Sequence, residues 1–266
     1  MTISRARSLL KDFMPPIFSR LIQNRSNRQI YFEETYLSWE DASTKCSGYD
    51  AENILAKVLD ATLRVKQGEA VYERDSVLFE KIEYCWLVLA GLMWAAARNG
   101  GHLNVLDFGG SLGSSYFQNL RFLRDLADVR WNVVEQKHYV SAGRKYIQDN
   151  QLRFYDDIDS CLSENRPNVV LLSSVLQYLK SPDQIIHQLS QVGASILIID
   201  RTPFSNLDYD TLAVQNISAS IYEASYPMWI FSEKRFDSLL ANSWAIVSRN
   251  LSPEGYFYMP SNLKFS

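Results

Sequence analysis

The stretch that decides the fold is Asn104-Val105-Leu106-Asp107-Phe108-Gly109-Gly110-Ser111-Leu112-Gly113. It is an apolar run that enters a glycine-rich turn. A helical pattern leaves the turn, and its apolar side consists of Leu112, Tyr116, Leu120 and Leu123. Glycines let the backbone approach a ligand closely, and a helix N-terminus offers free N–H groups to it. This strand, turn and helix therefore predict a nucleotide-type cofactor site at the carboxyl end of the strand.

The spacing of the glycines separates two classes of cofactor. The dinucleotide pattern G-x-G-x-x-G would need glycines where the chain has Ser111 and Ser114. The pattern acidic-x-G-x-G-x-G instead fits Asp107, Gly109 and Gly113, with serine in place of the middle glycine. That pattern is the first motif of class I S-adenosylmethionine-dependent methyltransferases, which the chain resembles. The open alternative is a structural strand-to-helix turn in another α/β protein.

Composition narrows the class of protein. The chain has 266 residues, a net charge of -3 and a pI near 5.7, which give no reason to expect nucleic-acid binding. The cysteines and histidines are too few and too scattered to indicate a disulfide framework or a metal site, so no metal is expected. The longest apolar run, 85–97, is shorter than the roughly 20 residues that a membrane-spanning helix needs. We expect a reduced, cytoplasmic protein.

Residues 1–100 are expected to form a basic N-terminal arm and a helical extension that packs on the core. Residues 1–30 contain six Lys or Arg against one Asp, a local charge of +5, between apolar residues. Such an arm either packs on the domain or brings it to an anionic surface at the inner face of the membrane, or to a partner. An irregular connection is expected over 31–50, a helix over 51–67, and a second helix that starts at Asp75 or Ser76.

Residues 101–266 are expected to form the cofactor-binding domain, because strands and helices alternate there. The predicted strands are 103–108, 129–134, 152–155, 169–173 and 195–200, with a closing hairpin of 244–251 and 256–259. This order predicts a doubly wound α/β fold: a seven-stranded, Rossmann-like methyltransferase sheet with its last strand antiparallel. Residues 201–231 lack a clear period and are expected to form a substrate lid.

The predicted cofactor ligands lie at the ends of the strands. Glu135 ends the second strand, where a carboxylate accepts the hydroxyl protons of a ribose. Asp156 follows the third strand, where class I methyltransferases often place a carboxylate near the adenine, and Asp157 competes for that role. The segment after the fourth strand resembles the one that small-molecule methyltransferases place beside the sulfonium. The full predicted set is Asp107, Phe108, Gly109, Gly110, Gly113, Glu135, Gln136, Asp156, Ser173 and Gln177.

The predicted acceptor site lies in the segment 201–231. Methyl transfer mainly requires that the acceptor be held in line with the methyl group, and a hydroxyl acceptor also needs a base. The candidate bases are Tyr222, Glu223 and Tyr226. The candidate acceptor-binding residues are Arg201, Tyr222, Tyr226 and Trp229. The alternatives are a surface ion pair for the arginine and packing on the sheet edge for the aromatic residues.

A closer resemblance rests on residues 105–116, 131–136 and 225–232. They are similar to bacterial methyltransferases associated with surface-polysaccharide assembly, such as that of lipopolysaccharide. The resemblance implies a sugar, sugar-nucleotide or lipid-linked glycan as acceptor. The leading hypothesis is S-adenosylmethionine-dependent methyl transfer to a hydroxyl or amine of a small or glycan-type acceptor. The rival is a non-catalytic cofactor-binding or scaffolding module of a polysaccharide-assembly complex, docked through the basic arm.

Overall fold

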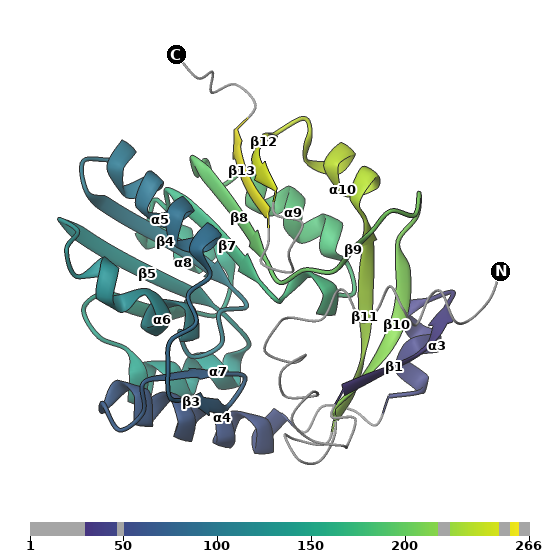
Figure 1. Ribbon diagram of the computed structural model, residues 1–266, viewed down its shortest axis with the longest axis horizontal. Helices are drawn as coiled ribbons and strands as arrows, with labels where there is room; N and C mark the ends of the chain where they lie inside the picture. The colour runs from purple at the N-terminus through teal and green to yellow at the C-terminus, as the bar shows by residue number, and fades with distance from the viewer. Residues whose placement is uncertain (1–29, 47–50, 218–223, 250–255, 261–266) are drawn as a thin grey trace.

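The computed structural model describes residues 30–46, 51–217, 224–249 and 256–260. The largest sheet contains β4 (His102–Phe108), β5 (Asp128–Val134), β6 (Leu152–Tyr155), β7 (Val169–Ser173), β8 (Ile196–Asp200), β12 (Trp244–Arg249) and β13 (Tyr256–Pro260). Their order across the sheet is β12-β13-β8-β7-β4-β5-β6 (Figure 1). The five strands from β6 to β8 run parallel, whereas β13 is antiparallel to β8 and to β12. The predicted parallel α/β core is therefore confirmed.

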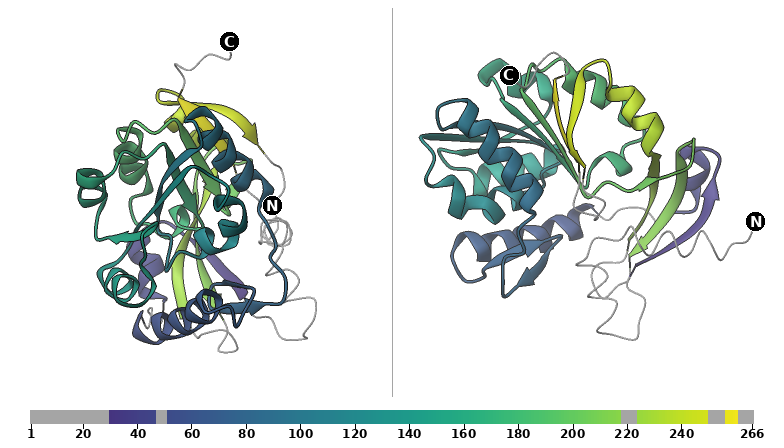
Figure 2. Two further views of the ribbon diagram at one scale, coloured as in Figure 1. Left: turned by 90° about the vertical axis from the view of Figure 1, so that its left-hand side faces the viewer. Right: turned by 45° about the horizontal axis from the view of Figure 1, so that its top comes forward.

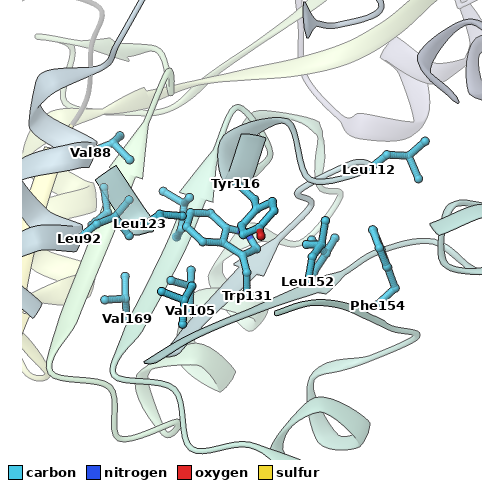
Figure 3. Close-up of a cluster of buried hydrophobic side chains, with 14 of the residues drawn as sticks. Val88, Leu92, Val105, Leu112, Tyr116, Leu123, Trp131, Leu152, Phe154 and Val169 are labelled. Atoms are coloured by element: carbon cyan, nitrogen blue, oxygen red, sulfur yellow. The ribbon is translucent and has the colours of Figure 1, made fainter. Parts of the chain in front are cut away.

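Helices cover both faces of this sheet. They are α4 (Ala51–Lys66), α5 (Trp86–Arg98), α6 (Ser114–Leu123), α7 (Lys137–Ala142, continued by η1, Gly143–Ile147), α8 (Ile158–Glu164), α9 (Pro182–Ser190) and α10 (Glu233–Leu240). Successive strand residues point to opposite faces. Val105 and Trp131 thus join the core formed with α4 to α7, part of which Figure 3 shows, whereas Leu106 and Val170 join the core formed with α8 to α10.

The order of the strands defines where ligands bind. From β4 the chain moves outward to β5 and β6, and then returns to β7 on the other side of β4. Open α/β sheets bind ligands at the carboxyl ends of the strands beside such a reversal. The glycine turn that follows β4 lies at this point, so the topology places the predicted site where the fold favours one.

The N-terminal part of the domain differs from expectation. Residues 31–50 were expected to be irregular, but they contain β1 (Ile30–Tyr36) and α3 (Trp39–Thr44), which Ser38 caps. The helix expected over 51–67 is confirmed as α4. The next helix does not start at Asp75 or Ser76. These residues, at φ 52° and 66°, instead close a hairpin of β2 (Tyr72–Arg74) and β3 (Val77–Phe79). Such a two-residue turn requires positive φ at both positions.

The expected lid is also different. Residues 201–231 contain β9 (Phe204–Ser205), β10 (Thr211–Ile217) and most of β11 (Ala224–Ser232). With β1 they form a second sheet in the order β1-β10-β11-β9, beside the main sheet (Figure 2). Leu212 and Val214 pack with Ala42 of α3 on one face. Because β1 pairs with β10, part of the expected N-terminal extension and part of the expected lid belong to one sheet.

Candidate functional site

The glycine turn after β4 is packed too closely for larger residues. Gly109, Ser111 and Gly113 have φ of 71°, 54° and 91°. A Cβ on Gly109 would lie 2.3 Å from Cγ2 of Val175, and one on Gly110 would lie 2.5 Å from the carboxyl group of Asp107. These approaches are shorter than van der Waals contact, so the packing of Val175 and Asp107 against the turn excludes a side chain at either glycine.

Asp107 lies beneath this turn, fully buried at the end of β4. The indole Nε1 of Trp131 donates to its Oδ2 at 2.9 Å, while Oδ1 has no hydrogen-bond partner among the described residues. Burial raises the pKa of Asp107 to about 7, although the bond from Trp131 lowers it. Asp107, predicted to bind the cofactor, therefore packs beneath the turn. Its buried Oδ1 without a hydrogen bond destabilises the fold unless a bound molecule supplies a partner.

The raised pKa of Asp107 predicts how stability depends on pH. The folded protein holds a proton on this group up to about pH 7, whereas the unfolded chain loses it near 3.8. The free energy of unfolding should therefore fall by up to about 1.4 kcal/mol per pH unit between these values and then level off. Asp107→Asn should flatten this fall, as measured by urea unfolding across that range. An unchanged slope in the variant would contradict the assignment.

Glu135 follows β5 and turns toward the glycine turn. Its Oε2 accepts the main-chain N–H of Gln136 at 2.6 Å, and the main-chain N–H of Ser111 also bonds to the carboxylate. Burial raises the pKa of Glu135, whereas these two N–H groups lower it. The structure thus brings together the glycine turn and the carboxylate predicted to bind a ribose.

The two aspartates after β6 have different positions. Asp157 caps α8 and accepts the main-chain N–H of Ser160 at 2.7 Å. Asp156 is exposed and pairs with Arg144 at 3.2 Å. Asp157 is therefore engaged in helix capping, and Asp156 is left as the candidate for the adenine at the end of β6.

Ser173 and Gln177, predicted beside the sulfonium, are tied to the end of β8. The Ser173 hydroxyl donates to Oδ2 of Asp200 at 2.6 Å. Gln177 is buried, and its Nε2 donates to the carbonyl oxygen of Arg201 at 3.1 Å. Its Oε1 has no partner among the described residues. Both side chains therefore lie at the same edge as the glycine turn, one strand further along the sheet.

Arg201 does not lie where either reading of the sequence placed it. Its side chain is only 14% exposed, with Nε 3.3 Å from Oδ2 of Asp200 and Nη1 3.9 Å from Oδ2 of Asp75. Its Nη2 also donates to Oγ of Ser173 at 3.1 Å. These contacts make it part of an internal ion-pair network rather than a surface pair or a free grip for an anionic acceptor. The contact with Asp75 was not predictable, because a helix was expected to begin there. The β2–β3 hairpin is what brings Asp75 close to Arg201.

The aromatic residues of β11 take two different places. Tyr226 packs edge-on against Tyr178, with ring centroids 5.0 Å apart, and the Tyr178 hydroxyl donates to Oε1 of Gln215 at 3.0 Å. Trp229 instead stacks on Trp39 at 6.0 Å and donates to the Leu179 carbonyl at 3.1 Å, so it anchors α3 and is engaged in packing. The candidates Tyr222 and Glu223 lie outside the described residues.

Two residues beside this edge were not predicted as site residues. Tyr178 belongs to η2 (Leu176–Tyr178), and burial raises its pKa to about 12, so it stays a phenol. Glu73 on β2 is 1% exposed and accepts the Ser114 hydroxyl. An aromatic residue shortly after β7 could have indicated Tyr178. Nothing in the local sequence pattern indicated Glu73.

Over the described ranges, no three His, Cys, Asp or Glu side chains gather into a group that could hold a metal ion. The same part of the chain contains no helix of the length and apolarity that crossing a membrane requires. The basic arm of residues 1–30 falls almost entirely outside the described residues, and its membrane contact stays a prediction.

No protein-family model matches the chain, and no curated protein matches it. Among solved structures, it is similar to magnesium protoporphyrin IX methyltransferase from Synechocystis PCC 6803 with bound S-adenosylmethionine, at 13% identity and a TM-score of 0.44, covering 81% of this chain and 99% of that one. It is also similar to an amino pentose methyltransferase from Micromonospora echinaspora with the same molecule bound, at 13% identity and a TM-score of 0.40, covering 87% and 100%. Likeness at this level carries no information about activity or acceptor.

Proposed function

We propose that the protein transfers a methyl group from S-adenosylmethionine to a hydroxyl or amine of a small or glycan-type acceptor. The observation that carries the proposal is the meeting of Glu135 with the glycine turn. A bare main chain and a carboxylate lie side by side at the carboxyl ends of two neighbouring strands. This pair suits a nucleoside, because the carboxylate accepts ribose hydroxyl protons while the turn lets the rest of the ligand approach.

The described residues fit this donor from one end to the other. Glu135 would hold the ribose, with Gln136 next to it, and Asp156 lies one strand further for the adenine. Ser173 and Gln177 follow β7, on the other side of β4, and would lie beside the methionine part. The turn itself would contribute the main chain of Phe108, Gly109, Gly110 and Gly113, with Asp107 packed beneath it.

The chemistry asks little covalent help from the chain. S-adenosylmethionine, when bound, supplies a methyl group that its sulfonium already activates. The chain holds the acceptor in line with that group and keeps water away. A hydroxyl or amine acceptor also gives up a proton, for which Tyr222, Glu223 and Tyr226 stay the candidate bases.

The nature of the acceptor rests on the sequence resemblance. A glycan-type acceptor, and any link to surface-polysaccharide assembly, stay predictions. Tyr178, Gln215 and Tyr226 contact one another where η2 meets β10 and β11, and they are the proposed polar and aromatic contacts of the acceptor. Aromatic rings beside an amide suit the apolar faces and the hydroxyls of a sugar. Arg201, which is paired with Asp75 and Asp200, is assigned to positioning these residues rather than to binding the acceptor directly.

Isothermal titration of S-adenosylmethionine, and of its demethylated product, tests the donor. We expect saturable one-to-one binding of both ligands well below millimolar concentration, because the turn and Glu135 are in place before the ligand arrives. Absence of binding by folded protein at millimolar ligand would remove the proposal. Where binding is found, methyl transfer to any member of a sugar-nucleotide panel would exclude the rival scaffolding function.

A further inference from the structure

Glu73 is, like Asp107, a buried carboxylate beside the proposed donor site. It lies on the short strand β2 and is 1% exposed. Its Oε1 accepts the Ser114 hydroxyl, and the main-chain N–H of Ser76 also interacts with the carboxylate, but Oε2 makes no hydrogen bond of good geometry to any described residue. A buried carboxylate oxygen without a partner destabilises the fold, so this arrangement calls for a compensating ligand or function.

The contact with Ser114 places Glu73 at the start of α6. Ser114 is the first residue of this helix, directly after the last glycine of the turn. The N-cap is Gly113, which has no side chain to bond the first N–H groups of the helix. The partial positive charge of a helix start favours a nearby carboxylate. Glu73 therefore fixes the junction between the glycine turn and α6 from the side, where a capping side chain would otherwise act.

The hairpin that carries Glu73 is anchored at both ends of the site. Glu73 holds the start of α6, and Asp75 lies 3.9 Å from Nη1 of Arg201 at the end of β8. Through these two side chains the hairpin contacts both the segment that follows β4 and the residue that follows β8. The sequence between the two contacts is short, so Glu73 has little freedom to leave its position.

Charge on Glu73 depends on pH in the neutral range. Burial raises its pKa to about 7 and the charge of Asp75 adds to this, whereas the bonds from the Ser114 hydroxyl and the Ser76 N–H and the charge of Arg74 lower it. Helix α4 also packs on β2 and carries Arg64 and Lys66 in its last turn. Asp107, beneath the same turn, titrates over the same range. A cationic ligand at this place would favour the ionised carboxylates.

We propose that Glu73 is a positioning residue for the methyl donor. It holds the start of α6 against the glycine turn through Ser114, and its second oxygen supplies negative charge that favours the cationic donor over the demethylated product. This inference rests on the proposed function. Glu73 would thus be a donor-site residue on the β2–β3 hairpin, which lies outside the parallel sheet.

The test compares Glu73→Gln with the wild type. Glutamine keeps an acceptor oxygen for Ser114 and removes the charge. We expect S-adenosylmethionine to bind the variant about tenfold more weakly at about pH 8, with a much smaller difference at about pH 6. The demethylated product, which lacks the sulfonium, should lose less than about threefold at either pH. Glu80→Gln, an exposed carboxylate just after the same hairpin, is the matched control and should bind as the wild type does.

The outcomes separate the inference from the proposed function. Parallel pH profiles for wild type and Glu73→Gln would overturn the role of Glu73 while leaving the donor site intact. Absence of binding by the wild type would instead overturn the donor itself. Should Glu73→Gln fail to fold, Glu73→Asp keeps the charge on a shorter side chain and should retain the pH dependence with weaker binding. Loss of that dependence in Glu73→Asp would also overturn the inference.

Discussion

Gly109→Ala should be among the most destabilising single substitutions in the domain. The new Cβ would lie 2.3 Å from Cγ2 of Val175, at a backbone φ of 71° that favours glycine. The backbone costs about 1 kcal/mol and the clash with a stiff β-branched side chain adds about 1–3 kcal/mol. We expect a loss of about 3 kcal/mol in the free energy of unfolding by urea denaturation.

Gly193→Ala is the matched control for this variant. Its φ is 78°, but a Cβ there meets nothing within 4 Å, so only the backbone cost of about 1 kcal/mol remains. Adding Val175→Ala to Gly109→Ala should restore part of the loss, because the nearest atom of residue 175 is then its Cβ, at 2.8 Å. Equal destabilisation by Gly109→Ala and Gly193→Ala would show that the turn is not packed on Val175 in solution.

Glu135→Ala should weaken S-adenosylmethionine binding by about 100-fold, because hydrogen bonds from ribose hydroxyls to a charged acceptor are among the stronger ones. Titration calorimetry measures the change. Burial raises the pKa of Glu135, so its removal relieves a desolvated charge and should not unfold the protein. The thermal midpoint of the free variant should stay at or above that of the wild type.

Two further variants test whether this loss comes from the Glu135 carboxylate. Glu135→Gln keeps one acceptor oxygen without the charge and should lose about tenfold in affinity. Asp159→Ala, an exposed acidic residue in the first turn of α8, should change the affinity by less than about twofold. A similar loss in Glu135→Ala and Asp159→Ala would mean that Glu135 does not contact the donor.

The parts of the site that were predictable are those encoded in consecutive residues. The run of apolar residues, the glycines and the helical stripe after them lie next to each other in the chain, and β4 ends at Phe108 as expected. The position of Glu135 beside the turn was predictable because a strand end is visible locally and parallel strands share one edge, whereas its contact with a ribose stays a prediction. Local patterns failed at Asp75 and Ser76, where a helix cap and a two-residue hairpin turn use the same kinds of residue.

The sequence by itself determined the parallel α/β core, the glycine turn and the carboxylate beside it, because each follows from short-range periodicity and from the geometry that parallel strands share. Only the tertiary structure decided that β1 pairs with β10, that Asp75 and Asp200 hold Arg201, and that Glu73 reaches Ser114. The physical reason is distance along the chain. Pairing and burial of polar groups depend on which remote segments meet, and no local pattern of residues carries that information.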